Sequence, residues 1–282
     1  MRLEAIALPL VRLALTEDIG GGDATTDAVV DEGAAGRAHI ISKQEGVLAG
    51  TEVASLAFRE RDPAAKIEWL VSEGGGVSRG AHVATIAAKA RAILTAERVA
   101  LNFLSHLSGI ATLARAFVKA VEGTGVRILD TRKTTPGLRF LEKHAAQMGG
   151  AVNHRFGLFD GILIKENHIV AAGGLKPAIE RARKVSEGLP VVVEAKTQDE
   201  ALDAAPMKPD RILLDNFTPS AIVAVLKQLR GGPEIEVSGG IRLANIRDFA
   251  LPGVSYISVG AITHSAPALD LSLVMDGVKA GA

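Results

Sequence analysis

The stretch PVVVEAKTQDEALDAAPMKPDRILLDNF (residues 190–217) joins two short apolar runs through a segment of helical composition. Runs like these, apolar over nearly their whole length, are typical of parallel strands covered on both faces. The same alternation of strand and helix extends on both sides of this stretch. The six expected strands are VRILD (126–130), GILIK (161–165), PVVVE (190–194), RILLD (211–215), EIEVS (234–238) and YISVG (256–260). Because a closed barrel has eight strands, we expect an open α/β barrel with parallel strands.

Each expected strand ends in a residue that can take part in chemistry. These residues are Asp130, Lys165, Glu194, Asp215, Ser238 and Gly260. The carboxyl ends of parallel barrel strands meet at one face, where such enzymes carry their catalytic groups. The pattern therefore predicts a ring of functional groups at that face.

The first third of the chain has a different pattern of apolar residues. The opening segment reads as an amphipathic helix, and residues 36–86 contain short apolar runs separated by glycine, which predict antiparallel strands. Apolar residues then recur at helical spacing over residues 95–121, with Thr95 as the expected N-cap. Arg98 would fall in the first turn, where the helix dipole disfavours a cation. Arg98 is thus either a solvated side chain or one held for a ligand.

Composition excludes several classes of protein. The chain has 282 residues, 48% of them hydrophobic, so it can bury a large core. Lysine plus arginine equals aspartate plus glutamate at 32 each, so no overall field favours nucleic acid or an acidic membrane. There is no cysteine, which excludes disulfides and thiolate sites. Charges interrupt the apolar N-terminal segment, so we expect no signal peptide, no membrane span and a cytoplasmic enzyme.

Cations cluster around the first two strand ends. Arg132 and Lys133 follow the first strand, His154 and Arg155 precede the second, and Lys165 ends it. Such a run can be a solvated face. A lysine directly after GILI should instead be desolvated unless it meets an anion, and the arginine fork pairs carboxylates and phosphates bidentately. We therefore expect an anion site here.

Acids and glycines follow the remaining strands. Glu194 and Asp215 could bind a hard cation such as Mg²⁺, hold sugar hydroxyls, or act as an acid and base. The nearby cations favour a phosphorylated sugar with magnesium. Glycine-containing turns at Ser238–Gly240 and Val259–Ala261 predict a phosphate cradle, because glycine lets backbone N–H groups approach an anion.

Several longer motifs, taken in order, resemble those of one known family, the decarboxylating quinolinate phosphoribosyltransferases. They are LTEDIGGGDATT (15–26), ERVALNFLSHLSGIAT (97–112), DTRKTTPGLR (130–139), GGAVNHRFGLFDGILIKENHI (149–169), RILLDNF (211–217), EVSGGI (236–241) and YISVGAITHSAPALDLSL (256–273). The resemblance covers nearly the whole chain.

The resemblance implies two domains and one reaction. An N-terminal α/β sandwich, residues 1–110 rejoined by the tail 270–282, would accompany an open α/β barrel at residues 111–269. The family transfers a phosphoribosyl group from phosphoribosyl pyrophosphate to quinolinate with Mg²⁺, giving nicotinate mononucleotide, pyrophosphate and carbon dioxide in NAD biosynthesis. No nucleic acid or membrane partner is implied.

The resemblance also assigns roles to individual residues. The quinolinate carboxylates would lie on Arg132, His154, Arg155 and Lys165, with Thr131 beside them and Lys133 between quinolinate and pyrophosphate. Glu194 and Asp215 would take the ribose hydroxyls and magnesium, directly or indirectly, and with Lys133 would be the catalytic set. The 5′-phosphate would lie on Ser238, Gly239, Gly240, Val259, Gly260 and Ala261. Arg98 would reach the site of a neighbouring subunit in a homodimer, or in a hexamer built from dimers.

One departure and several alternatives accompany this reading. Val192 and Lys196 stand where the family commonly has acidic or polar residues around Glu194, which removes negative charge near the magnesium site. The same fold could act on another aromatic acid, as in a nicotinate-specific or molybdenum-associated branch. A non-catalytic phosphosugar-binding or lipoyl-like carrier protein would be the alternative from another class.

Overall fold

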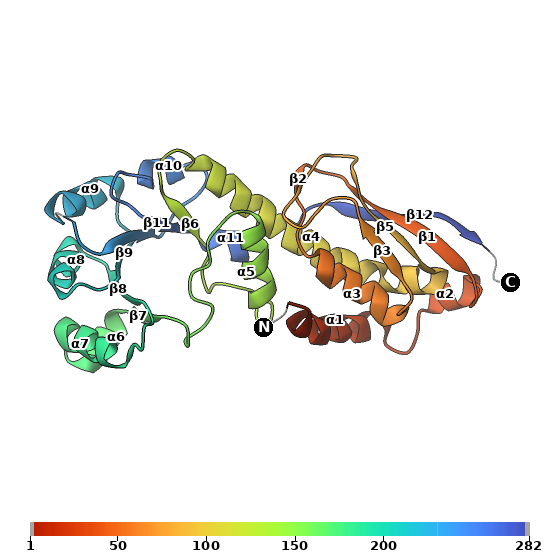
Figure 1. The fold of residues 1–282 in the computed structure, drawn as a ribbon, viewed down its shortest axis with the longest axis horizontal. Helices are drawn as coiled ribbons and strands as arrows, with labels where there is room; N and C mark the ends of the chain where they lie inside the picture. Colours follow the sequence, from red (N-terminus) through yellow and green to blue (C-terminus); the bar gives the residue numbers. More distant parts are fainter. Residues whose placement is uncertain (1–2, 230, 280–282) are drawn as a thin grey trace. The chain divides into compact units, whose positions relative to one another are not determined.

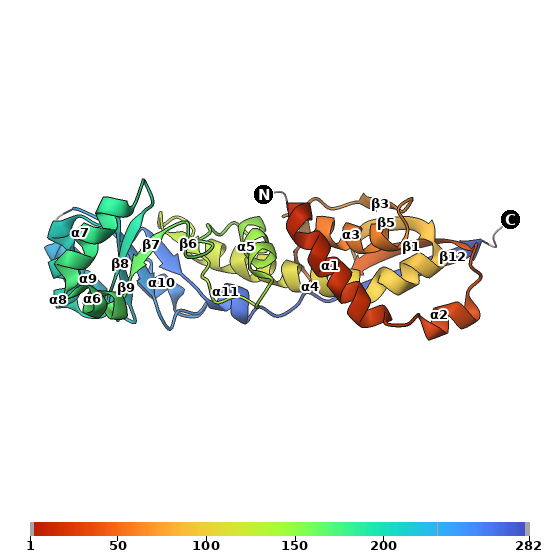
Figure 2. The ribbon, with the colours of Figure 1, turned by 90° about the horizontal axis from the view of Figure 1, so that it is seen from below.

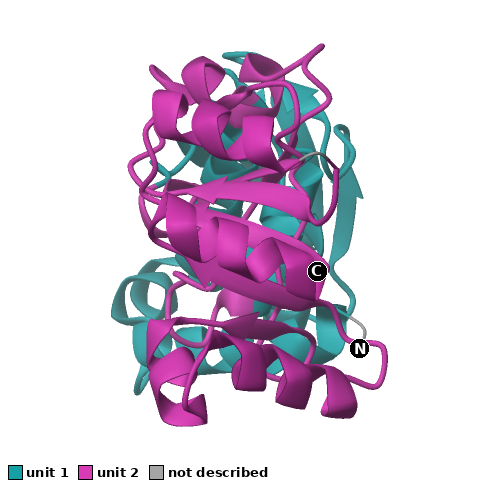
Figure 3. Ribbon diagram, turned by 90° about the vertical axis from the view of Figure 1, so that its left-hand side faces the viewer, with its two compact units in different colours: residues 1–115, 140–150, 266–282 teal, residues 116–139, 151–265 magenta. Residues whose placement is uncertain are grey.

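A computed structural model describes residues 3–229 and 231–279. The chain divides into two compact units, coloured separately in Figure 3. Unit 1 comprises residues 1–115, 140–150 and 266–282, and unit 2 comprises residues 116–139 and 151–265. Residues 140–150 thus group with unit 1, whereas the sequence analysis assigned them to the barrel. The division also falls at residue 115 rather than residue 110.

Unit 1 is built on a four-stranded antiparallel sheet with the strand order β12-β1-β5-β3. Figures 1 and 2 show helices α1 and α3 side by side against this sheet. The elements of unit 1 are α1 (Leu3–Ile19), α2 (Ala24–Val29), β1 (Ala35–Ser42), β2 (Gly46–Val47), α3 (Thr51–Arg61), β3 (Lys66–Trp69), β4 (Gly76–Val77), β5 (His82–Lys89), most of α4 (Ala90–Ala120), nearly all of α5 (Arg139–Met148) and β12 (Leu271–Lys279). The antiparallel strands expected in residues 36–86 are present, but helix α3 was not expected.

The chain's last described strand completes the unit 1 sheet. Strand β12 pairs antiparallel with β1 from Ser42↔Leu271 to Ala35↔Lys279. Leu269 and Leu271, at the start of this segment, are buried. Residues more than 200 positions apart therefore share one sheet, and the predicted return of the C-terminal tail to the N-terminal part describes this pairing.

Helix α4 begins earlier than the sequence analysis predicted. It starts at Ala90, directly after strand β5, so Thr95 lies within the helix and is not its N-cap. The Thr95 hydroxyl donates to the carbonyl oxygen of Arg91 at 2.7 Å. Arg98 accordingly lies well inside the helix, and the argument that the helix dipole disfavours its charge is wrong.

Unit 2 contains the six predicted parallel strands in one sheet, in the order β6-β11-β10-β9-β8-β7. Strands β6 and β7 are the two edges, so the sheet is an open barrel, as Figure 1 shows. The elements are β6 (Arg127–Leu129), β7 (Ile162–Ile164), α6 (Glu166–Ala172), α7 (Leu175–Val185), β8 (Val191–Ala195), α8 (Gln198–Ala204), a 3₁₀ turn η1 (Ala205–Met207), β9 (Arg211–Asp215), α9 (Pro219–Gln228), β10 (Glu234–Ser238), α10 (Ile246–Phe249), β11 (Tyr256–Ser258) and α11 (Ala261–His264). The predicted fold class is confirmed.

The strand sequences account for the burial of the helix-covered face of this sheet. Val191, Val193, Ile212, Leu214, Ile235 and Val237 are buried. In Figure 2 helices α6–α9 lie along one side of strands β7–β9. Alternate strand residues point in opposite directions, so Glu194, Asp215 and Ser238 face away from these helices, toward the barrel interior. No helix in the described part of the chain is both long and apolar enough to cross a membrane.

Candidate active site

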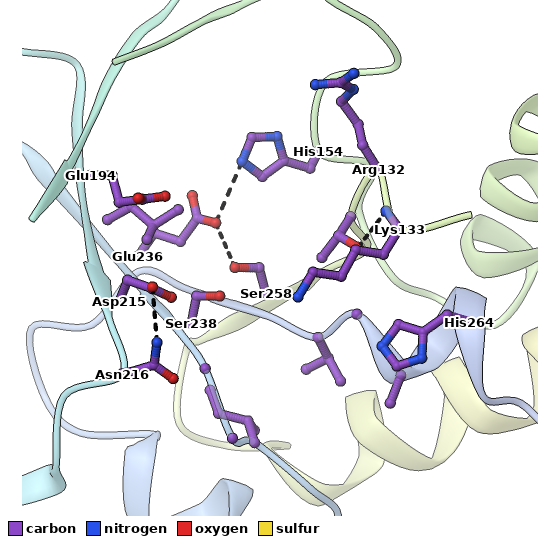
Figure 4. A pocket seen from close by; sticks show the side chains of 18 of the residues that line it. Arg132, Lys133, His154, Glu194, Asp215, Asn216, Glu236, Ser238, Ser258 and His264 are labelled. Carbon is purple, nitrogen blue, oxygen red and sulfur yellow. Dashed lines mark hydrogen bonds and ion pairs between the residues drawn. The ribbon is translucent and has the colours of Figure 1, made fainter. Parts of the chain in front are cut away.

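A pocket of about 800 Å³ lies within unit 2 at the carboxyl ends of the parallel strands. Figure 4 shows side chains from several strand ends and loops pointing into it. The predicted site residues that line it are Thr131, Arg132, Lys133, His154, Arg155, Lys165, Glu194, Asp215, Ser238, Gly239, Gly240, Val259, Gly260 and Ala261. Arg98 is the exception: it is an exposed residue of α4 in unit 1.

Arg132 and Arg155 both line the pocket and interact electrostatically. Arg132 Nε is buried and donates to no atom of the described chain. Arg155 donates through Nη1 to the carbonyl oxygen of Gly161 at 2.9 Å. Burial, followed by the positive charge of Arg132, lowers the pKa of Arg155 from its ordinary value. An anion bound near both guanidinium groups would offset the burial of Arg155 and its repulsion by Arg132.

Lys165 is half-exposed, and it meets an anion supplied by the protein itself. It directly follows β7 at the N-cap of α6, its side chain is 46% exposed, and its ammonium forms an ion pair with Glu194. Glu194 itself is only 9% exposed, so the lysine supplies the counter-charge that a buried carboxylate needs.

Asp130 does not line the pocket but binds the loop that does. It is fully buried, accepting a hydrogen bond from the His154 backbone N–H at 2.8 Å and one from Asn153 Nδ2 at 2.5 Å. Of the six strand-end residues predicted to form a functional ring, the other five line the pocket. Asp130 instead fixes the loop that carries His154 and Arg155.

Asp215 and the first glycine turn are connected through Asn216. Asn216 donates from Nδ2 to Asp215 Oδ2 at 2.9 Å, and its backbone N–H donates to the carbonyl oxygen of Ser238 at 2.8 Å. It adopts a left-handed conformation with φ of 61°. A Cβ atom at Gly239 would lie only 2.2 Å from Asn216 Oδ1, so only glycine fits there. Asn216 thus joins the acid at one strand end to the turn at the next.

The second glycine turn is shaped by close packing. Gly260 has an ordinary helical φ of −65°, but a Cβ atom there would approach His264 Nε2 at 3.1 Å and Lys133 Cδ at 3.2 Å. Thr263 Oγ1 donates to the carbonyl oxygen of Lys133 at 2.7 Å and so holds the Lys133 loop against this turn. A side chain at position 260 would therefore require His264 and Lys133 to shift by a few tenths of an ångström, whereas the backbone conformation there allows any residue.

Lys196, one of the departures from the family pattern, forms an ion pair with Glu166. The hydrogen bond and charge of Glu166 raise the pKa of Lys196, and Glu194 and Asp215 add smaller contributions in the same direction. The Lys196 ammonium therefore lies within electrostatic reach of both predicted acids. It offsets part of their negative charge, as the sequence analysis expected.

Sequence reasoning missed several pocket residues. The most informative of them are Asn216, Glu236, Arg242, Ser258 and His264. The strand period of two provides a signal for Glu236 and Ser258, because Glu236 shares a face with Ser238 and Ser258 shares one with Gly260. Asn216, Arg242 and His264 lie on loops or a short helix, where no periodicity marks them.

An open parallel barrel whose strand ends carry clustered cations, two acids and two glycine turns is typical of α/β-barrel enzymes that act on phosphorylated ligands. Comparison with known families specifies which one. Residues 23–108 match the N-terminal domain of quinolinate phosphoribosyl transferase, and residues 110–274 match its C-terminal domain. The chain belongs to the quinolinate phosphoribosyl transferase family.

Individual relatives agree with this assignment over nearly the whole chain. The probable nicotinate-nucleotide pyrophosphorylase [carboxylating] of Bacillus subtilis is 39% identical over 258 residues, covering 91% of this chain and 89% of that protein. The nicotinate-nucleotide pyrophosphorylase [carboxylating] of Mycobacterium leprae is 41% identical over 269 residues, covering 93% and 95%. The solved nicotinate-nucleotide pyrophosphorylase of Francisella tularensis superposes with a TM-score of 0.94 at 40% identity, covering 98% of each chain.

Proposed function

We propose that this chain catalyses decarboxylating phosphoribosyl transfer from phosphoribosyl pyrophosphate to quinolinate, a step of de novo NAD biosynthesis. The observation that carries the proposal is the composition of the unit 2 pocket. Its cations, Arg132, Lys133, Arg155 and Lys165, share one cavity with two acids and two glycine turns. A dicarboxylate acceptor and a phosphorylated sugar donor together match that set of charges. The names of the relatives support the same reaction.

The acceptor end of the pocket suits a dicarboxylate. Arg132 brings a buried N–H donor that no described atom accepts, and Arg155 and Lys165 add two more positive charges. Planar guanidinium groups bind carboxylates through paired hydrogen bonds, which also fix the orientation of the ring. A monoacid such as nicotinate would leave one of the two guanidinium groups without a carboxylate, since Glu194 pairs with Lys165. We therefore assign quinolinate, rather than nicotinate, as the acceptor.

The reaction follows from the charges around the sugar. The quinolinate ring nitrogen forms a bond to the anomeric carbon while the bond from that carbon to pyrophosphate breaks. Positive charge develops on the ribose, where the Glu194 and Asp215 carboxylates stabilise it, and negative charge develops on pyrophosphate near Lys133. The alkylated ring then loses its adjacent carboxylate as carbon dioxide. The bonding electrons stay on the ring carbon, which takes up a proton to give nicotinate mononucleotide.

The two pocket acids also suit a weakly held magnesium ion. Among residues 3–229 and 231–279, no group of three or more His, Asp or Glu side chains is arranged to hold a metal. Magnesium in phosphate-transfer sites is commonly held by one or two carboxylates and completed by substrate phosphates and water. Glu194 and Asp215 could supply that protein part, and magnesium bound there would neutralise charge on the leaving pyrophosphate.

The functional unit in this proposal is a homodimer, or a hexamer of such dimers, in which Arg98 of the partner subunit completes each site. Two observations support this role. Arg98 is exposed, and no hydrogen bond or ion pair formed by the described residues involves its guanidinium group. It is therefore available for a ligand. A cytoplasmic location stays a prediction.

The test is turnover by the purified protein with quinolinate, phosphoribosyl pyrophosphate and Mg²⁺. We expect equal release of carbon dioxide and nicotinate mononucleotide. We expect Arg132→Ala to lower kcat/KM for quinolinate by about 100-fold, because a charged, paired hydrogen bond is lost. Arg181→Ala, which removes an exposed arginine of α7 outside the pocket, should leave turnover unchanged. Turnover with nicotinate and none with quinolinate would refute the substrate assignment.

A further inference from the structure

Glu236 is a fully buried carboxylate in the floor of the pocket, and the mechanism above does not use it. It lies on β10 two residues before Ser238, so both side chains point into the barrel. Figure 4 shows it between Glu194 and His154. A buried charge costs several kcal/mol unless it is paired and hydrogen-bonded. Its contacts therefore show what keeps it there.

Three side chains satisfy the Glu236 carboxylate. Ser258 Oγ donates to Oε1 at 2.6 Å, and Arg211 Nη1 donates to Oε2 at 2.8 Å. Arg211 is itself held by stacking on the Tyr256 ring, 3.8 Å from the ring centroid. The third partner is His154, whose Nε2 lies 3.5 Å from Oε1. Ser258 and Arg211 thus supply one donor to each carboxylate oxygen, and the Arg211 guanidinium provides the counter-charge that a buried carboxylate needs.

The contacts of His154 determine which of its ring nitrogens carries the proton. Nδ1 accepts a hydrogen bond from the Arg155 backbone N–H at 2.7 Å, so it carries no proton in this arrangement. The proton of the neutral ring must then lie on Nε2, which faces the Glu236 carboxylate. The backbone on the other side of His154 is held by Asp130. Nδ1 is thus held by a backbone hydrogen bond, and Nε2 lies at the outer limit of hydrogen-bonding distance from the carboxylate.

We propose that Glu236 is a positioning residue that holds His154 as the neutral Nε2–H tautomer, with its ring turned toward β10. The Glu236 carboxylate, Ser258 and Arg211 form a rigid support, and His154 transmits its position to the Arg155 backbone through Nδ1. The ring therefore contributes shape and orientation to the acceptor site, and Arg132, Arg155 and Lys165 contribute the charge. The substrate part of this statement rests on the proposed function.

The tautomer can be measured on the ligand-free protein by long-range ¹H–¹⁵N NMR after ¹⁵N-histidine labelling. The chain has seven histidines, and His154→Gln identifies the signal of interest. We expect wild-type His154 to be the Nε2–H tautomer at neutral pH. An imidazolium or an Nδ1–H tautomer at neutral pH would overturn the proposal without any variant of Glu236.

The matched pair of variants is Glu236→Gln and Glu234→Gln. Glu234 lies on the same strand and also contacts Arg211, but its side chain is 47% exposed and it does not contact His154. In Glu236→Gln we expect altered ¹⁵N shifts of His154 and a rise of about 10–100-fold in KM for quinolinate, with KM for phosphoribosyl pyrophosphate within about twofold, as for residues that orient a binding group. Glu234→Gln should change neither quantity.

The outcomes separate the two proposals. Unchanged His154 shifts in folded Glu236→Gln, or changed shifts with an unchanged KM for quinolinate, would refute the positioning role. If Glu236→Gln does not fold, Ser258→Ala removes a support of the carboxylate and should broaden or shift the His154 signals; unaltered signals would count against the proposal. Wild-type protein without quinolinate turnover would refute the proposed function, while the tautomer measurement would still decide what Glu236 does.

Discussion

At the scale of single residues, the contact between Asn216 and Gly239 is the tightest constraint on the predicted phosphate site. Asn216 holds Asp215 while occupying a left-handed conformation, which costs a non-glycine residue about 1 kcal/mol or more. Its amide fills the space that a side chain at position 239 would need. The acid and the glycine turn are therefore interdependent, although they lie on different strands.

We predict that Gly239→Ala lowers kcat/KM for phosphoribosyl pyrophosphate by about 100-fold, because a new methyl group displaces Asn216 and with it Asp215 by a substantial fraction of an ångström. We also expect a loss of about 2 kcal/mol in the free energy of unfolding, from the positive φ of 99° and the overlap. Steady-state kinetics and urea unfolding followed by circular dichroism measure the two effects.

Gly253→Ala is the control for this substitution. Gly253 has nearly the same φ, 97°, but it lies outside the pocket and its Cβ atom would meet only the end of the Leu226 side chain, at 3.2 Å. It should lose about 1 kcal/mol of stability with unchanged kinetics. Equal kinetic effects of the two substitutions would show that the Asn216 contact has no role of its own.

The predicted site residues follow apolar strands in the sequence, whereas the missed ones depend on contacts between strands. Arg132, Lys133 and Lys165 stand out because charged groups follow apolar strands, where burial alone would exclude them. Glu236 lies inside a strand, and its buried carboxylate is stabilised by hydrogen bonds from Arg211 and Ser258 on the two neighbouring strands. Such pairing depends on strand order, and strand order cannot be read from one segment. His154 shows the same limit, since one of its ring nitrogens contacts its own loop and the other faces Glu236 on strand β10.

At the scale of elements, helix α3 begins without a capping side chain of its own. Its N-cap is Gly50, and a carboxylate from a later loop replaces the missing cap. Glu73 accepts from the backbone N–H groups of Gly50 and Thr51 at 2.7 and 2.9 Å, and His144 Nε2 lies 3.3 Å away. Burial acts to raise the pKa of Glu73, but the hydrogen bonds from His144, Thr51 and Gly50 outweigh it and lower the pKa.

We predict that Glu73→Gln lowers the free energy of unfolding of unit 1 by about 2 kcal/mol at pH 7, since hydrogen bonds to a charged acceptor are lost. The folded pKa lies below the unfolded value of about 4.3, so this contribution is fully present above that pH and disappears as the pH falls through the folded pKa. Wild type and variant should therefore converge in acid. Trp69, the single tryptophan, reports the transition because its Nε1 donates to Ser55 on α3.

Glu52→Gln provides the comparison for Glu73. Glu52 is an exposed acid in the first turn of α3, so its loss should cost only the helix-dipole contribution of about 0.3–1 kcal/mol. A Glu73→Gln variant whose deficit persists unchanged at pH 3 would mean that packing, and not the carboxylate charge, supports this end of the helix.

The start of helix α4 shows why elements are predicted better than their boundaries. The helical spacing of apolar residues identified the helix, and Thr95 resembled an N-cap. The true first N–H, that of Ala90, donates to the carbonyl oxygen of Ala34 at 2.8 Å, so a distant segment of backbone does the work of a cap. The residues around position 90 do not predict a contact with a segment more than 50 residues earlier in the chain.

At the scale of the whole molecule, each of the two compact units is assembled from segments that are separated in the sequence. The family resemblance implied domain boundaries after residues 110 and 269. In the structure α4 runs through residues 90–120 without interruption, and residues 140–150 and 266–282 belong to unit 1. Local patterns identified both sheets, but they carry no information about which unit a connecting helix joins. Only the return of the tail was anticipated, through the family resemblance.

The same scale bears on the proposed dimer, in which Arg98 serves the partner's site. Two inactive variants then become complementary: Arg98→Ala lacks the donated arginine, and Arg132→Ala lacks a cation of its own pocket. In a mixed dimer one site combines both defects, and the other combines an intact pocket with Arg98 of the partner subunit. Random exchange of equal amounts makes half of the dimers mixed. We predict recovery of about a quarter of wild-type activity after mixing, which follows from two-fold symmetry alone.

The measurement is activity after the two variants are co-expressed or mixed under conditions that permit subunit exchange. Mixing Arg98→Ala with itself at the same total concentration provides the baseline. A pair in which both defects fall in one pocket, Arg132→Ala with Lys165→Ala, should recover nothing, because every site in that mixture keeps a defect. If Arg98 acted within its own subunit, the Arg98→Ala and Arg132→Ala mixture would behave like this second pair. Recovery in the first mixture alone thus requires that each site draw on two chains.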